Sequence, residues 1–166
     1  ERARLHAASI VGVKKSEQND IKDLIDFKTH MQITENQKDM ATKKIRDYYN
    51  EKGKKKTKIS LEEYTDTTSF NASNIVIRID KKERVKIQDI VFHGNEALSD
   101  KKLRRAMKNT KKKAWYILKR SKYIEKNYET DKKNILDKYK KIGYRDVEIE
   151  RDSVYDIDST LMHIDI

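Results

Sequence analysis

The sequence contains no cysteine and no proline, and it has only four glycines among 166 residues. The lack of cysteine excludes disulfide bonds and thiolate zinc sites, and it is compatible with reducing and with oxidising compartments. Long apolar runs are also missing, so no segment approaches the roughly 20 residues that a helix needs to span a bilayer. The chain opens with ERARL, without a basic-then-apolar leader, and we expect it to be a piece of a longer protein.

Patterns typical of catalysis and cofactor binding are absent as well. The sequence has four histidines, His6, His30, His93 and His163, which fall in separate segments without the paired spacing of metal ligands. No serine lies in a G-x-S-x-G turn, and four scattered glycines cannot form a glycine-rich phosphate loop. Carboxylates that alternate along residues 146–150 are typical of a solvated strand face. We therefore expect no enzyme activity, no catalytic residue, no metal and no cofactor.

Positive charge is what the sequence has in excess, with 39 basic against 28 acidic residues. Eleven of the basic residues lie between Lys101 and Lys122, a stretch without any acidic residue. The segment KKKAWYILKRSKY, residues 111–123, covers its second half and includes Trp115, the only tryptophan. Basic residues interleaved with aromatic ones favour contact with nucleic acid or with an anionic membrane surface.

The four glycines expose an internal repeat. Gly12 and Gly94 lie 82 residues apart, and at that offset ERARLHAASIVG aligns with ERVKIQDIVFHG without a gap. Gly53 and Gly143 lie 90 residues apart, and there IRDYYNEKG aligns with ILDKYKKIG. The second copy therefore has eight extra residues between its glycines. We predict two tandem domains, 1–82 and 83–166, the second with an elaborated connection at about 107–127.

The second copy shows the clearer succession of elements. Apolar residues alternate through 85–92 as in a strand, and Ser99 is a good N-cap for a helix with its apolar face at Leu103. A second helical pattern covers 131–142, and Gly143 suits its C-terminal cap. Residues 146–151 alternate again and predict a strand. A turn at 156–159 and a last alternating segment, 162–166, complete a hairpin.

The first copy repeats this order. Ile21, Leu24 and Ile25 predict one helix, and Thr34 with Gln37 forms a capping box for the next. Strand patterns follow at 57–61 and 75–79. The fold class predicted for both copies is α+β, two tandem β-α-α-β-β units, each a three-stranded mixed sheet covered on one face by two helices.

A β-α-α-β-β unit of this size, with GN after the first strand and GY after the second helix, resembles a POTRA domain. The motifs are Gly94-Asn95 and Gly143-Tyr144, and in the first copy Val13 and Lys54 replace the asparagine and tyrosine. The tandem resembles the periplasmic arm of an outer-membrane β-barrel assembly protein. The resemblance implies a chaperone-like scaffold on the periplasmic side of the outer membrane, with the barrel outside this chain. Its implied partners are unfolded β-barrel proteins and accessory lipoproteins.

In the family that the chain resembles, the penultimate strand is a sheet edge, and edges can accept an extended peptide as an added strand. The resemblance implies edge residues Lys56, Thr57, Lys58, Ile59, Ser60 and Leu61 in the first copy, and Asp146, Val147, Glu148, Ile149, Glu150 and Arg151 in the second. The alternative is that these charged edges simply stay solvated.

The basic connection leaves two further readings open. It is either a solvated loop with Trp115 and Leu118 packed inward, or a contact surface for anionic lipid or an acidic protein. The candidate contact residues are Lys111, Lys112, Lys113, Trp115, Tyr116, Lys119, Arg120 and Lys122. A nucleic-acid-binding α/β module is the other alternative, but the sequence lacks a G-x-x-G clamp and an aromatic RNA-binding strand motif.

Overall fold

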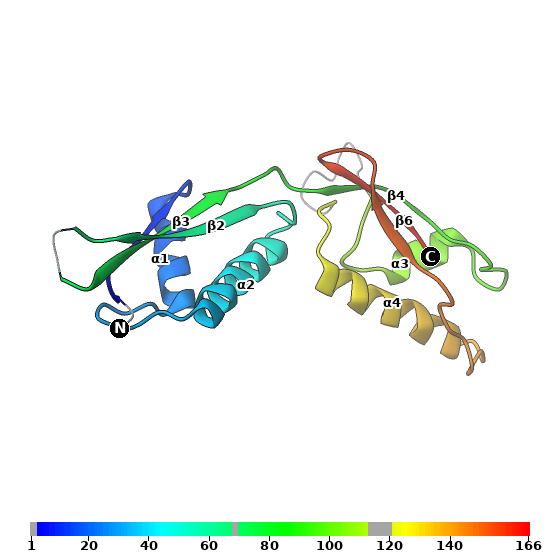
Figure 1. The fold of residues 1–166 in the computed structure, drawn as a ribbon. Coiled ribbons are helices and arrows are strands. Elements are labelled where there is room, and N and C mark those ends of the chain that lie inside the picture. The colour runs from blue at the N-terminus through cyan, green and yellow to red at the C-terminus, as the bar shows by residue number, and fades with distance from the viewer. Residues whose placement is uncertain (1–2, 68–69, 113–120) are drawn as a thin grey trace. The chain divides into compact units, whose positions relative to one another are not determined.

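The computed structural model describes residues 3–67, 70–112 and 121–166. The chain divides into two compact units, Glu1–Tyr49 with Lys54–Lys82, and Asn50–Gly53 with Glu83–Ile166. Each unit is a three-stranded sheet with two helices on one face (Figure 1). The α+β class and the β-α-α-β-β order predicted from the sequence are therefore confirmed.

The first unit contains β1 (Arg4–Val11), α1 (Lys15–Ile25), α2 (Glu35–Glu51), β2 (Lys58–Thr65) and β3 (Ala72–Asp80). The sheet order is β1-β3-β2, with β1 parallel and β2 antiparallel to the central strand β3. The predicted capping box starts α2, because the Gln37 N–H donates to Thr34 Oγ1 at 3.2 Å and the Thr34 N–H donates to Gln37 Oε1 at 2.8 Å.

The second unit contains β4 (Lys86–Val91), α3 (Asp100–Ala106), α4 (Glu125–Lys140), β5 (Ser153–Asp156) and β6 (Leu161–Asp165). Its sheet order is β4-β6-β5, with the same pattern of parallel and antiparallel pairs. Ser99 is the N-cap residue of α3, as predicted, although its side chain makes no capping hydrogen bond.

A break in the strand alternation marks a β-bulge at the same place in both units. Apolar residues in β4 skip from Ile87 to Ile90, and the pairing with β6 shifts between Ile87 and Asp89. The first unit shows the shift between Leu5 and Ala7, which lie 82 residues earlier. One extra residue on the bulged strand reverses the side-chain alternation, so both apolar sets still face the helices.

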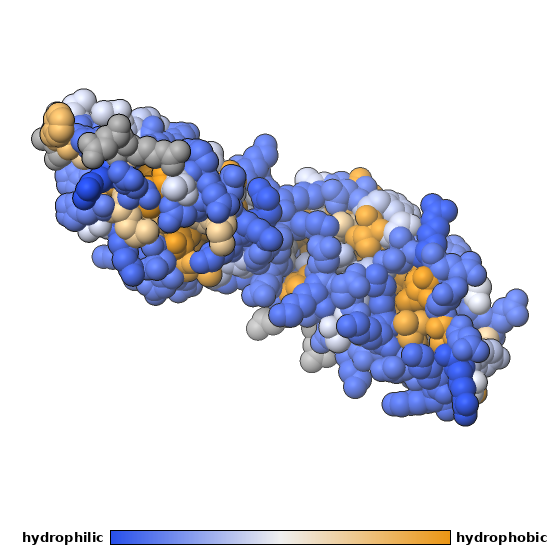
Figure 2. Space-filling model, turned by 60° about the horizontal axis from the view of Figure 1, so that its bottom comes forward, coloured by the Kyte–Doolittle hydropathy of each residue, from blue (hydrophilic) through white to orange (hydrophobic). Residues whose placement is uncertain are grey.

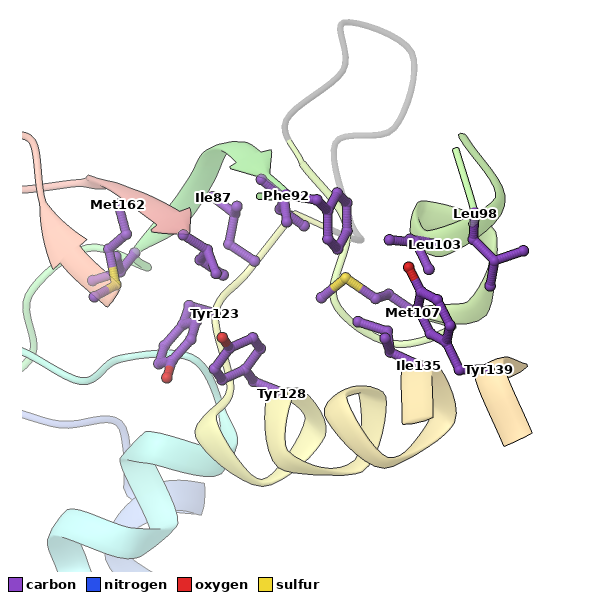
Figure 3. Packing of buried hydrophobic residues seen from close by; sticks show 13 residues of the cluster. Ile87, Phe92, Leu98, Leu103, Met107, Tyr123, Tyr128, Ile135, Tyr139 and Met162 are labelled. Carbon is purple, nitrogen blue, oxygen red and sulfur yellow. The ribbon is translucent and has the colours of Figure 1, made fainter. Parts of the chain in front are cut away.

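The two cores are built from corresponding positions. Ile21 and Leu103 are fully buried at offset 82, and Ile45 and Ile135 are buried at offset 90. Figure 3 shows the second core, in which side chains from α4 point toward those of the sheet and α3. Both offsets found in the sequence therefore hold for the packed interior.

A buried carboxylate in the second unit has no counterpart in the first. Asp131 on α4 is fully buried, and it accepts hydrogen bonds from the backbone N–H groups of Lys108, Asn109 and Thr110 at 2.9, 3.0 and 2.5 Å. These three residues begin the elaborated connection. The position 90 residues earlier is Ala41, which is also buried. The carboxylate therefore anchors the connection that distinguishes the second unit.

Candidate functional site

The candidate site is the open edge of each three-stranded sheet. In both sheets, one edge strand is partly covered by the connection between the helices and the other is not. The connection between the helices bonds to the first strand: the Leu5 N–H donates to Met31 O at 2.8 Å, and the Ile87 N–H donates to Ser121 O at 2.7 Å. In the second unit, the Tyr123 N–H also donates to Val85 O at 3.0 Å. Because this side is partly occupied, the edges available along their length are β2 and β5.

Sequence reasoning assigned the peptide-accepting edge to the penultimate strand and did not predict that the helix connection occupies the opposite edge. The signal was present, because Ile33 and Tyr123 lie 90 residues apart and are both buried. A shared apolar residue just before the second helix indicates a shared contact of the connection with the core.

The β2 edge offers four outward backbone positions. The bond from the Asp66 N–H to Ala72 O, 2.8 Å long, continues the β2–β3 register and identifies this pair as hydrogen-bonded. Antiparallel pairs alternate between hydrogen-bonded and non-hydrogen-bonded types. The backbone N–H and C=O groups that point away from β3 are therefore those of Ile59, Leu61, Glu63 and Thr65.

The β5 edge offers fewer such positions. The bond from the Ile157 N–H to Leu161 O sets the same alternation in the second hairpin. The outward groups within β5 are those of Val154 and Asp156. The first unit therefore has twice as many outward positions on its open edge strand.

Both edge strands differ from the sequence prediction. β2 begins at Lys58 and runs to Thr65, so Lys56 and Thr57 precede it and its second half was missed. The strand predicted at 146–151 is wrong, because β5 is Ser153–Asp156 and residues 147–152 belong to no strand. Their alternation is real, since Val147 and Ile149 are half-buried between exposed neighbours. One-sided burial of an extended segment produces this pattern without any strand partner.

Charged side chains flank the β2 edge. Lys38 Nζ on α2 lies 2.5 Å from Glu63 Oε2 and 2.7 Å from Glu35 Oε1. The hydrogen bond from Lys38 lowers the pKa of Glu63, and the bonds to Glu35 and Glu63 raise the pKa of Lys38. On the other face of the strand, Glu62 pairs with Tyr64 and with Arg78. These pairs lie beside the edge and leave its outward backbone groups unpaired within the sheet.

The signature residues lie in the loops that bound the helices. Asn95 Nδ2 donates to Leu98 O at 2.9 Å and to Asp100 Oδ1 at 3.0 Å, which holds the chain before α3. Gly94 and Gly143 both have positive φ, the region that favours glycine. Tyr144 packs edge-on against Tyr139, with ring centroids 5.8 Å apart.

The predicted basic surface is described only in part. Lys113, Trp115, Tyr116, Leu118, Lys119 and Arg120 lie outside the described residues. Lys111 Nζ donates to Arg104 O at 3.0 Å, and Lys112 Nζ lies 3.2 Å from Asp89 Oδ1. Lys122 forms an isolated antiparallel bridge with Lys86. The ends of the connection are therefore fastened to α3 and β4.

Two histidines that are far apart in the sequence contact the same carboxylate in the structure. His93 Nε2 and His163 Nε2 each lie 3.3 Å from Asp165 Oδ1. Across the described ranges, no group of three histidine or acidic side chains is arranged to hold a metal ion. The described helices include none that is long and apolar enough to cross a membrane.

Comparison with known proteins agrees with this geometry. Residues 85–166 match the family model described as "POTRA: Surface antigen variable number repeat". Over 98 residues the chain is 35% identical to outer membrane protein assembly factor BamA of Neisseria meningitidis serogroup B. That match covers 58% of this chain and 12% of the relative's length.

Solved structures match both units. The crystal structure of Haemophilus influenzae BamA POTRA3-5 has a TM-score of 0.60 at 16% identity, and the match covers 98% of this chain and 59% of that chain. BamA of Haemophilus ducreyi lacking POTRA domains 1-3 has a TM-score of 0.58 at 15% identity, with coverage of 99% and 28%. At these identities the likeness shows the fold.

The fold therefore defines a tandem of two POTRA-type modules. Through residues 85–166 the chain belongs to the POTRA family, and the first unit has the same fold. The resemblance drawn from the GN and GY motifs is confirmed.

Proposed function

We propose that this chain is part of the periplasmic arm of an outer-membrane protein assembly factor, with residues 1–82 and 83–166 as its two POTRA repeats. It acts as a scaffold without catalytic chemistry. The family match and the identity to an assembly factor named BamA support this proposal. The chain spans 12% of that relative's length, so the proposal concerns a module and the longer protein that contains it.

We further propose that the module binds unfolded outer-membrane proteins, and accessory proteins with extended segments, by adding their strand to an open sheet edge. The observation that carries this is the row of outward backbone groups on β2, from Ile59 to Thr65. Main-chain pairing depends little on sequence, which suits clients that share only the alternation of membrane strands. Ile59 and Leu61, whose side chains pack toward the core, would keep the edge in place.

The test uses a ten-residue peptide of alternating aromatic and polar residues, labelled with a fluorophore and titrated with the 166-residue chain. Glu63→Pro removes one outward N–H and leaves the bonds to β3 in place, because proline is tolerated on the free side of an edge strand. We expect peptide affinity to fall by about tenfold, roughly the loss of one or two hydrogen bonds.

Glu63→Ala is the matched control, since it also removes the ion pair with Lys38 but keeps the N–H. It should bind as the parent chain does. Equal binding by the proline and alanine variants would exclude edge addition at β2. Backbone amide shifts confined to 59–65 on peptide addition would support it.

A further inference from the structure

A cluster of exposed basic residues lies on α3 and just after its end, outside the sheet edges. Lys101, Lys102, Arg105 and Lys108 are all exposed. Within the described residues, none of these four side chains takes part in an ion pair. Their basic neighbour Arg104 is engaged instead, since its Nη2 donates to Ile90 O at 3.0 Å and reaches Asp100. We call these four residues the α3 basic face.

The first unit shows that the fold does not require this charge. At the offset of 82, the four corresponding residues are Asn19, Asp20, Asp23 and Asp26, and all are exposed. The same face of the first helix is thus mainly acidic in one unit and basic in the other. The apolar residues that hold the two helices to their cores, Ile21 and Leu103, are equally buried. Packing cannot explain the difference, because these side chains do not enter the core. The basic residues are therefore available for a contact outside the unit.

The chemistry of the face favours a layer of anionic headgroups over a folded protein. Protein interfaces have a buried centre rich in aromatic and apolar residues. The large exposed apolar side chains of the described residues include Tyr64, Ile142 and Tyr155, and none lies between Asp100 and Lys112. An anionic bilayer needs only basic residues near its surface, with each contributing additively to attraction. The sequence after α3 continues without an acid to Lys122 and adds Trp115 and Tyr116, residue types enriched at membrane interfaces.

We infer that the α3 basic face binds anionic lipid headgroups and holds the second unit against a membrane surface. This inference is independent of peptide addition at β2, because it uses other residues of another unit. The two proposals can therefore fail separately.

The experiment measures co-sedimentation of the 166-residue chain with vesicles of phosphatidylcholine containing about 30% phosphatidylglycerol. The variant K101Q/K102Q/R105Q/K108Q should bind at least about 30-fold more weakly, since each lysine or arginine near the surface contributes several-fold. Binding of the parent chain should disappear with pure phosphatidylcholine and weaken strongly in about 0.5 M salt.

The matched control K133Q/K138Q/K140Q/K141Q removes the same charge from exposed positions in the second half of α4 and at its C-cap. It should retain binding within about threefold, because those residues lie outside the α3 basic face. An equal loss in both variants would show a response to net charge alone and would overturn the inference.

A second variant, K101N/K102D/R105D/K108D, gives α3 the residues of the corresponding α1 face, which the fold already accommodates in the first unit. It should fold normally by circular dichroism and lose vesicle binding completely. Persistent binding by this folded variant would overturn the inference. Tighter binding of the parent chain to polyglutamate than to the anionic vesicles would also overturn it, in favour of an acidic protein partner.

Discussion

The two units share a frame and differ in three places, which are their open edge, their helix connection and the charge of their first helix. β2 has eight residues where β5 has four, and Ala41 stands where Asp131 anchors the longer connection. The surface of both units is mainly hydrophilic in the view of Figure 2, with small apolar patches. The core therefore fixes what is common to the repeats, and the exposed elements carry what separates them.

The largest difference should come from exchanging the buried residues at the connection. Asp131→Ala leaves three backbone N–H groups without their acceptor and should destabilise the second unit by about 3 kcal/mol. Ala41→Asp buries a carboxylate without donors and should cost the first unit at least as much, about 3 kcal/mol or more. Native-state hydrogen exchange by NMR reports each unit separately.

If the backbone amides of the second unit exchange as slowly in Asp131→Ala as in the parent chain, the helix connection does not depend on Asp131 for its stability. Asp131→Asn keeps one acceptor oxygen. It should destabilise the second unit by about half as much as Asp131→Ala does.

The second largest difference should be the cost in stability of replacing the glycine that follows the first strand of each unit. A Cβ on Gly12 would lie 2.1 Å from Ile79 O, whereas a Cβ on Gly94 meets no atom within 4 Å. Both residues have positive φ, so alanine is strained at either position by about 1 kcal/mol. Gly12→Ala should cost about 2 kcal/mol more than Gly94→Ala, as overpacking typically does. Urea unfolding of both variants measures the difference, and equal costs would contradict the close approach at Gly12.

The alternation of outward and paired groups on β2 can be checked without mutation. The N–H groups of Ile59, Leu61 and Glu63 should exchange with solvent at least about 100-fold faster than those of Ser60 and Glu62, which face β3. Amide exchange in the parent chain measures this directly. The reverse alternation would move the proposed docking groups to the other residues and would require Glu62→Pro as the test variant.

The smallest effect is the pH dependence of the Lys38–Glu63 pair in the first unit. Because the pKa of Glu63 is lowered in the folded chain, its pair with Lys38 stabilises the unit above the unfolded value near 4.5. That stability is lost as pH falls through the lowered folded pKa. Since the pair is partly exposed, Lys38→Met should cost less than about 1 kcal/mol at pH 7. The cost should vanish once the pH is below the lowered folded pKa, where Glu63 is protonated in both states.

In the second unit, the residue that corresponds to Lys38 is Tyr128, whose hydroxyl donates to Asp152 at 3.0 Å. Burial, followed by this bond to Asp152, raises the pKa of Tyr128. Asp152 also lies 3.2 Å from Lys132 Nζ, so the second unit has a lysine–carboxylate pair of its own. A cost of Lys38→Met that is unchanged when Glu63 is protonated would remove Glu63 as its cause.

Much of the fold was readable from local patterns. The capping box at Thr34, the N-cap at Ser99 and the two offsets predicted the elements and cores of both units. The open edges were harder to locate, since alternation along 146–151 reports burial on one side and gives no information about pairing. The spacing of Asp131 from Ile135 and Tyr139 places it on the buried side of α4, but its role as an anchor was missed because no local pattern indicates which distant N–H groups it accepts from.

The sequence by itself determined that two copies of one α+β unit follow each other, because apolar periodicity and glycine positions depend on the local backbone and are repeated in order. It also determined the charge contrast between α1 and α3, once the copies were aligned. Only the tertiary structure decided which sheet edge stays open, which backbone groups point outward and where the buried carboxylate finds its donors. Those features depend on hydrogen bonds between segments far apart in the chain, and no local pattern encodes which partner a strand will meet.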